Sequence, residues 1–224
     1  MAGLPQGAAR LSAAPGDGPP PALRPLVLAS GSPRRRDLLG AAGWVFDVRP
    51  VDADESVLPG EDALTLCLRL SCLKAAVAAE RFGGGADAPA CVLGGDTVVA
   101  VDGRPLGKPA DREEAAAMLR ELSGREHEVA SGVALRHLPT GREAAELAVS
   151  RVRFDALDET TLETYLAGGE WDGKAGAYAI QGRAAAFAHL VHGDLDTVVG
   201  LPVRLVERLA RQLAQDVADA GAAP

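Results

Sequence analysis

The sequence predicts an α/β protein with a mixed sheet, and three features of its hydrophobic pattern support this prediction. Apolar runs at residues 26–29 and 91–101 are typical of buried strands. Between them, apolar side chains at residues 63–81 recur every three or four positions, as on one face of a helix. Residues 128–137 and 142–154 flank a Pro-Thr-Gly turn and predict an antiparallel hairpin. Because helices alternate with strands first and a hairpin follows, the sheet should contain both parallel and antiparallel pairs.

Capping residues define where the predicted helices begin. Ser32 and Pro33 follow the first strand and fit the N-cap and the first position of a helix. Asp111 and Glu114 have the spacing of a capping box, which predicts a helix that continues to Leu122. The other expected elements are a strand at 45–48, a helix at 158–166, a strand at 186–191 and a helix at 202–213.

The chain of 224 residues is expected to fold as one domain between two tails. Residues 1–24 are rich in Pro, Ala and Gly and have no apolar run long enough for a secretory signal, which predicts a disordered tail. The apolar pattern ends near Leu213. The folded domain is therefore expected at 25–213, with a second disordered tail at 214–224.

Charge and hydropathy argue against several classes of protein. The net charge is −8 and the pI is about 5.0, so a nucleic-acid binder with a broad basic surface is not expected. A membrane span is not expected either, because no apolar run reaches about 18 uncharged residues. Cys67, Cys72 and Cys91 are odd in number and lack metal-binding spacing. They predict buried thiols and a reducing compartment, the cytoplasm.

Positive charge at the start of a predicted helix gives the first indication of a ligand. Arg34, Arg35 and Arg36 lie in its first turn, where they oppose the helix dipole and repel one another. A turn of small residues before a helix presents free backbone N–H groups, and arginine adds forked donors that fit phosphate oxygens. The pattern predicts a phosphate site that includes Ser32, and a solvated basic turn is the alternative.

An acidic residue inside the central apolar strand gives the second indication. Asp96 follows two glycines there, and an ionised carboxylate in a buried strand is costly unless it is paired, protonated or bound to a metal. Asp96 is therefore a candidate general base or metal ligand, and Glu55 is a second acidic candidate. Two carboxylates can hold one divalent cation that bridges phosphate oxygens. The alternatives are an aspartate bonded to backbone amides and a solvated acidic loop.

Two lysines and one glutamine complete the set of candidates. Lys74 lies beside the apolar stripe of the long helix, and Lys108 precedes the helix that Asp111 caps. Each can point into a cleft, although a surface lysine is the simpler interpretation of either alone. Gln181 lies in a loop of small residues, and its carboxamide both donates and accepts, which suits the edge of a nucleobase. Hydrogen bonding within the loop is the alternative.

Taken together, these residues resemble the Maf proteins, nucleoside triphosphate pyrophosphatases also described as septum-formation inhibitors. The resemblance extends over nearly the whole predicted domain. The motifs that carry it are Leu28–Arg35, Asp54–Ser56, Gly95–Val99, Leu106–Pro109, Ala175–Gly182 and Val198–Pro202. It implies two lobes around a central cleft, similar to the inosine-triphosphate pyrophosphatases, and often a homodimer. It also implies hydrolysis of a nucleoside triphosphate to the monophosphate and pyrophosphate with Mg²⁺ or Mn²⁺.

By motif position, the resemblance implies that Asp96 is the catalytic carboxylate, acting as base, as metal ligand or as both. It also implies a phosphate and metal cluster made by Ser32, Arg35, Glu55, Lys74 and Lys108. The branch of the family that acts on dTTP and UTP is similar to this chain at Arg34, Thr97 and Gln181. The chain departs from the family at Gly173, which lies inside the usual Asp-Lys-Ala-Gly run and leaves the role of the following lysine open.

Two other functions stay open at this stage. The chain could be a nucleotide-binding regulator of cell division that needs no turnover, or a pyrophosphatase for another nucleotide such as CTP or 7-methyl-GTP. The set Glu55, Asp96 and Lys108 favours an enzyme, because a protein that only binds a polyanion has less need of a carboxylate facing it.

Overall fold

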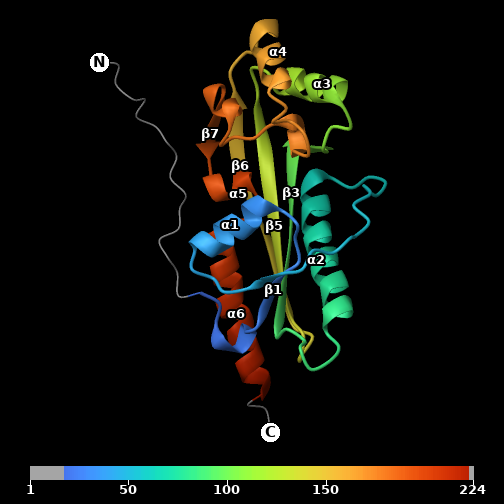
Figure 1. Ribbon diagram of the computed structural model, residues 1–224, viewed down its shortest axis with the longest axis vertical. Helices are drawn as coiled ribbons and strands as arrows, with labels where there is room; N and C mark the ends of the chain where they lie inside the picture. Colours follow the sequence, from blue (N-terminus) through green and yellow to red (C-terminus); the bar gives the residue numbers. More distant parts are fainter. Residues whose placement is uncertain (1–17, 222–224) are drawn as a thin grey trace, which may run out of the picture.

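The computed structural model describes residues 18–221 and contains a mixed sheet of seven strands (Figure 1). Their order is β2-β1-β3-β5-β6-β7. β3 is longer than β1, which pairs with residues 91–93, and β4 pairs with residues 99–101 of β3. β1 pairs in parallel with β2 and β3, and all other pairs are antiparallel. The strands are β1 Leu26–Leu28, β2 Asp47–Val48, β3 Cys91–Val101, β4 Arg104–Leu106, β5 Glu126–His137, β6 Glu143–Phe154 and β7 Ala188–His192. The predicted mixed α/β class is confirmed.

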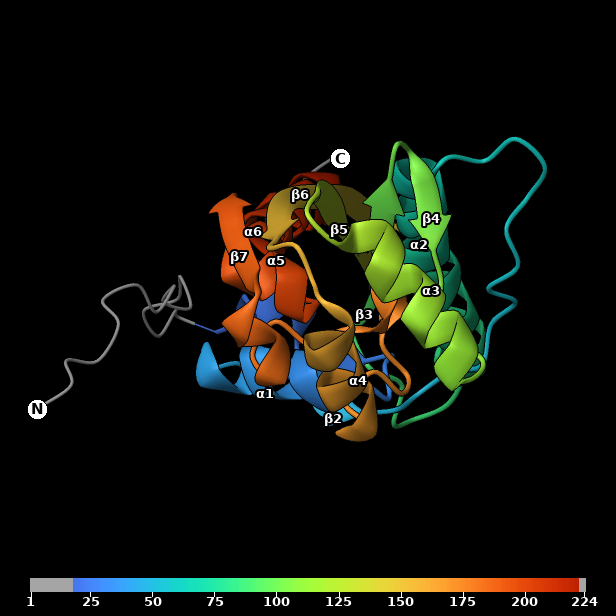
Figure 2. The same ribbon diagram turned by 90° about the horizontal axis from the view of Figure 1, so that it is seen from above.

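Helices cover both faces of this sheet (Figure 2). They are α1 Pro33–Ala41, α2 Ala63–Phe82, α3 Arg112–Leu122, α4 Glu159–Ala167, α5 Leu195–Val199 and α6 Val203–Gly221. Three short 3-10 turns are η1 Pro21–Leu23, η2 Ala175–Ala177 and η3 Arg183–Ala186. Both predicted caps are confirmed, because the side chains of Ser32 and Asp111 accept hydrogen bonds from the backbone N–H groups of Arg35 and Glu114. β4, α5 and the 3-10 turns are not in the sequence prediction, since elements of three to five residues carry no periodic pattern.

Two glycines let α2 approach the sheet closely. A Cβ atom at Gly94 would lie 2.4 Å from the backbone oxygen of Ser71, and a Cβ atom at Gly132 would lie 2.3 Å from the side-chain Oγ of Ser71. Gly94 is on β3 and Gly132 is on β5, so any larger side chain there would push α2 away from two neighbouring strands. This close approach sets how near a side chain of α2 comes to β3.

The core has two large clusters of buried side chains that share β3. Cys91 and Leu93 belong to the cluster built with β1, α1 and α6, whereas Val99 and Val101 belong to the cluster built with α3 and α4. Figure 1 shows these two groups of helices at opposite ends of the sheet. The clusters correspond to the two predicted lobes, and Asp96 lies on β3 between them.

Part of each predicted tail is ordered in the structure. Residues 1–17 of the N-terminal tail lie outside the described residues, but the next residues are ordered and the side chain of Leu23 is completely buried in the core. At the other end α6 continues to Gly221, so the expectation of disorder from residue 214 is wrong. Ala214, which follows Leu213 directly, and Val217, about one turn farther on, pack against the core. Alanine is also the best helix former, which explains the extra turns.

None of the described helices is long and apolar enough to cross a membrane. The three cysteines are free thiols, of which Cys67 and Cys91 are buried as predicted and Cys72 is only partly buried. Burial raises the pKa of Cys67 to about 12, so this thiol is protonated and unreactive at neutral pH.

Candidate active site

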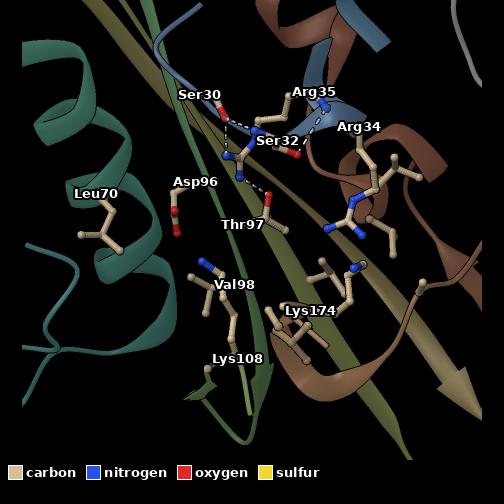
Figure 3. Close-up of a pocket in the computed structure, with 18 of the residues that line it drawn as sticks. Ser30, Ser32, Arg34, Arg35, Leu70, Asp96, Thr97, Val98, Lys108 and Lys174 are labelled. Atoms are coloured by element: carbon tan, nitrogen blue, oxygen red, sulfur yellow. Dashed lines mark hydrogen bonds between the residues drawn. The ribbon is translucent and has the colours of Figure 1, made fainter. Parts of the chain in front are cut away.

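A cavity of about 1000 Å³ lies between the two lobes (Figure 3). One wall is the turn before α1 and its first residues, the floor is the middle of β3, and the other wall is the loop after β4 with residues 170–182. All the predicted site residues line it: Ser32, Arg34, Arg35, Glu55, Lys74, Asp96, Thr97, Lys108 and Gln181. The structure thus brings together side chains that are up to 149 positions apart in the chain, from Ser32 to Gln181.

A lysine joins the two carboxylates of the cavity. The Nζ atom of Lys74 lies 2.7 Å from Oδ1 of Asp96 and 2.6 Å from Oε1 of Glu55. Lys108 adds a longer contact of 3.7 Å to the other oxygen of Glu55. Lys74 and Asp96 are each only 8% exposed, so this is a buried ion pair rather than the surface lysine that is the simpler interpretation of the sequence. Although burial acts to raise the pKa of Glu55, hydrogen bonds and charge attraction from Lys74 and Lys108 lower it overall.

Arg35 is held by three oxygen acceptors. Its Nε donates to the backbone oxygen of Gly200 at 2.8 Å, Nη1 to Ser30 at 3.2 Å and Nη2 to Oγ1 of Thr97 at 3.0 Å. Burial lowers the pKa of Arg35, and the negative charge of Asp96 counteracts this effect. The guanidinium is therefore fixed between the N-terminal end of α1 and the middle of β3. Its three hydrogen-bond acceptors are uncharged, so none of them neutralises its positive charge.

The other two arginines of the triplet divide between cavity and solvent. Arg36 is exposed and pairs with the neighbouring Asp37 at 2.9 Å, whereas Arg34 lines the cavity. Within residues 18–221 the buried Nε atom of Arg34 has no hydrogen-bond partner. Burial and the charge of Arg35 lower the pKa of Arg34, so two positive charges stand close together with a donor unused. Such an arrangement favours an anion in the cavity.

Lys174, whose role the sequence leaves open, belongs to the same wall. Its Nζ donates to the backbone oxygen of Asp172 at 2.9 Å, and Figure 3 shows its side chain near that of Arg34. Burial and the charge of Arg34 lower the pKa of Lys174. Gly173 has a φ of +65° and open space around the position of a Cβ atom, so the departure from the family pattern leaves this lysine at the cavity.

The loop that carries Gln181 is fixed by a carboxylate. Oε2 of Glu170 accepts from the backbone N–H of Arg183 at 2.7 Å. A Cβ atom at Gly182 would lie 2.1 Å from that same oxygen, so a larger residue at this position would displace the Glu170 carboxylate. Glu170 thereby sets the turn that directly follows Gln181.

Comparison with known proteins adds to this geometry. The family model described as "Maf-like protein" matches residues 25–213. The chain belongs to the Maf family. It is 45% identical to a dTTP/UTP pyrophosphatase of Pelotomaculum thermopropionicum over 84% of this chain and 97% of that protein. It is also 45% identical to one of Anaeromyxobacter dehalogenans, over 84% and 93% of the two chains, and 48% identical to one of Brucella abortus, over 80% and 86%.

The two carboxylates fit a cation that arrives with a phosphate ligand. No group of three or more His, Cys, Asp or Glu side chains that could hold a metal occurs in the part of the chain that the structure describes. Glu55 and Asp96 nevertheless converge on one point, the Nζ atom of Lys74. Mg²⁺ is commonly bound by one or two carboxylates together with substrate phosphates and water. Two carboxylate oxygens would supply two of the six ligands of an octahedral Mg²⁺, and phosphate oxygens and water would have to supply the others.

Three polar residues at the cavity wall or behind it are not among the residues that the sequence predicts. Glu170 holds the turn after Gln181, His127 bonds through Nε2 to the hydroxyl of Tyr178 at 2.8 Å, and Ser131 bonds to Thr97 at 2.8 Å. None of them belongs to a motif quoted for the Maf resemblance. Once the pairing of β3 with β5 is known, the register places Ser131 opposite Thr97, and this is the signal that would have identified it.

Proposed function

We propose that this protein hydrolyses nucleoside triphosphates to nucleoside monophosphate and pyrophosphate, and that dTTP and UTP are its substrates. The observation that carries the proposal is the cavity in which Arg34, Arg35, Lys74 and Lys108 surround the carboxylate of Asp96. Arg34, Arg35 and Lys108 suit a polyanion, while Lys74 holds the carboxylate of Asp96, and this carboxylate suits the activation of water. The names of the Maf relatives support dTTP and UTP in particular.

The positive side chains bind and orient the triphosphate. Arg34 lines the cavity beside Arg35, Arg35 is held rigidly by three acceptors, and Lys108 is exposed enough to move toward a ligand. Rigid, already oriented donors lower the cost of ordering the site when charge builds up on phosphate oxygens. This set fixes the chain of phosphates relative to Asp96.

Asp96 accepts the proton of the water that attacks the α-phosphorus. Lys74 holds the Oδ1 atom of this carboxylate at 2.7 Å and so fixes its orientation. We propose further that Glu55 and Asp96 bind Mg²⁺ or Mn²⁺ with the substrate, and this cation would supply neutralisation of phosphate charge. Water attack breaks the bond between the α and β phosphates. The products are pyrophosphate, which the lysines and arginines bind, and the nucleoside monophosphate, which keeps the nucleobase.

Pyrophosphate release from a panel of triphosphates tests this proposal. The panel contains dTTP, UTP, CTP, GTP, ATP and 7-methyl-GTP, each with and without Mg²⁺ or Mn²⁺. We expect turnover of dTTP and UTP, and a loss of about 10²–10⁴-fold in Asp96→Asn, because the amide cannot act as a base. Asp155→Asn, which changes an exposed aspartate outside the cavity, is the matched control and should keep its activity. Binding of UTP without pyrophosphate release in the wild type would instead support a regulator that needs no turnover.

A homodimer, a cytoplasmic location and the lack of a nucleic-acid partner are also proposals. The family resemblance supports the first, the three free cysteines support the second, and the net charge of −8 supports the third. Sedimentation at several protein concentrations tests the homodimer, and a gel-shift assay with duplex DNA and RNA tests the third proposal.

A further inference from the structure

A chain of hydrogen bonds runs from the cavity into the core behind it. Nη2 of Arg35 donates to Oγ1 of Thr97 at 3.0 Å, and this oxygen lies 2.8 Å from Oγ of Ser131. Ser131 in turn donates to the backbone oxygen of Thr197 at 2.7 Å. The four residues come from α1, β3, β5 and α5, and Thr97 and Ser131 are directly opposite each other in the pairing of β3 with β5.

Counting donors fixes the direction of every bond in this chain. A hydroxyl has one hydrogen to donate and two lone pairs that accept. Because Ser131 donates its hydrogen to Thr197, it must accept at its contact with Thr97. Thr97 therefore donates to Ser131 and presents its lone pairs to Arg35, which has only donors. The alternative acceptor for Thr97, the backbone oxygen of Gly200, lies farther away at 3.4 Å and already accepts from Arg35.

Burial makes this direction stable. Ser131 has no exposed surface and Thr197 is only 2% exposed, so water does not compete for either group. Ser131 is also absent from the lining of the cavity, while Thr97 and Arg35 both line it. The hydrogen bonds of Ser131 therefore reach the cavity by two routes, through Thr97 and through α5, whose Val198 and Val199 line the cavity.

We propose that Ser131 is a positioning residue of the active site, which orients the hydroxyl of Thr97 so that Thr97 holds Arg35 in place for the triphosphate. This inference rests on the proposed function. It also gives Thr97 a specific role: its hydrogen is committed to Ser131 and one lone pair to Arg35, so Thr97 acts on the substrate through the arginine.

The test compares Ser131→Ala with a matched serine. Ser150 on β6 is equally buried and donates to the backbone oxygen of Asp194, next to α5, but it has no bond to Thr97 or Arg35. We expect Ser131→Ala to lower kcat/KM for UTP by about 3- to 10-fold, the effect of one net hydrogen bond, mainly through KM. Ser150→Ala should lose similar thermal stability and keep its kcat/KM.

A double-mutant cycle separates positioning from a general loss of stability. In a Thr97→Val background the bond to Ser131 is already gone, so Ser131→Ala should cause almost no further loss of kcat/KM. Effects of Ser131→Ala and Thr97→Val that multiply, or a kcat/KM of Ser131→Ala equal to that of Ser150→Ala, would overturn the proposal. If Ser131→Ala does not fold, Ser131→Cys takes its place, because a thiol fills the space with a weak donor and acceptor.

The same proteins keep the two proposals apart. Turnover by the wild type tests the proposed function, and the ratios between variants test Ser131. If the wild type releases no pyrophosphate from any triphosphate, calorimetric Kd values for UTP in the four proteins of the cycle carry the test of Ser131 instead. A Kd that rises in Ser131→Ala and does not rise further in the double variant supports the positioning role, and an unchanged Kd overturns it.

Discussion

Replacement of Lys74 by methionine should destabilise the protein by about 3–5 kcal/mol at pH 7. Nζ of Lys74 lies 2.7 Å from Asp96, and both side chains are about one-tenth exposed, so the methionine leaves a buried carboxylate without its cation. The bond to Glu55 adds little to this sum, because the Glu55 side chain is 45% exposed and solvent screens it. Methionine keeps most of the volume of the lysine stem, so a cavity contributes little.

Denaturation in urea measures this loss as the free energy of unfolding. Arg120→Met is the matched control, because Arg120 pairs with Glu159 at a similar distance of 2.9 Å on the surface, with side chains 52% and 71% exposed. The control should lose at most about 1 kcal/mol. The comparison isolates the effect of burial from that of removing an ion pair.

A second cycle attributes the loss to the pair itself. In an Asp96→Asn background, Lys74→Met no longer strands a charged carboxylate, so its cost should fall by at least about 1 kcal/mol. If Lys74→Met costs no more than Arg120→Met, or if its cost is the same with and without Asp96→Asn, the buried ion pair does not matter for stability and the reasoning is refuted.

Three further predictions concern pH, substrate and core. Burial lowers the pKa of His127 from 6.5 to about 4, so stability should fall by about 3 kcal/mol as the pH drops from 6.5 to 4, and His127→Gln should flatten this part of the urea-denaturation profile. Gln181→Ala should reduce the preference for UTP over 7-methyl-GTP by about 10- to 100-fold in kcat/KM, and equal efficiencies in the wild type would contradict the assignment. Leu23→Ala should lower the free energy of unfolding by about 2–5 kcal/mol, because Leu23 is completely buried. A loss below about 1 kcal/mol would show that Leu23 does not pack in the core.

The sequence predicts long, periodic elements well because local rules determine them. The stripe that predicts a helix at 63–81 corresponds to α2, and the continuous apolar run at 91–101 corresponds to β3 with the same bounds. The end of α6 was predicted wrongly for a related reason. Beyond Leu213 the many alanines interrupt the apolar pattern, but alanine is itself a strong helix former and Val217 packs against the core.

The sequence also predicts some features of the candidate site and not others. Asp96 is predicted because a carboxylate is unusual in an apolar strand, whereas Thr97 is named only through the family resemblance. The environment of Lys74 was not predictable, since it depends on α2 lying close to Gly94 and Gly132 across the sheet. A sequence shows that a glycine is present but not which backbone approaches it.

The charges of the cavity are matched unevenly, and this explains why an anion should bind where it does. Lys74 is neutralised by Asp96 and Glu55, so it serves the carboxylates more than it attracts a ligand. Arg35 is held by carbonyl and hydroxyl oxygens, and Arg34 keeps a buried donor without a partner in the described chain, so both retain their full charge toward the cavity. In the proposed mechanism, the attraction for phosphate therefore comes from the α1 side of the cavity and the activation of water from the β3 side. A triphosphate drawn to the arginines is thereby brought against Asp96, which is the geometry that hydrolysis within the phosphate chain requires.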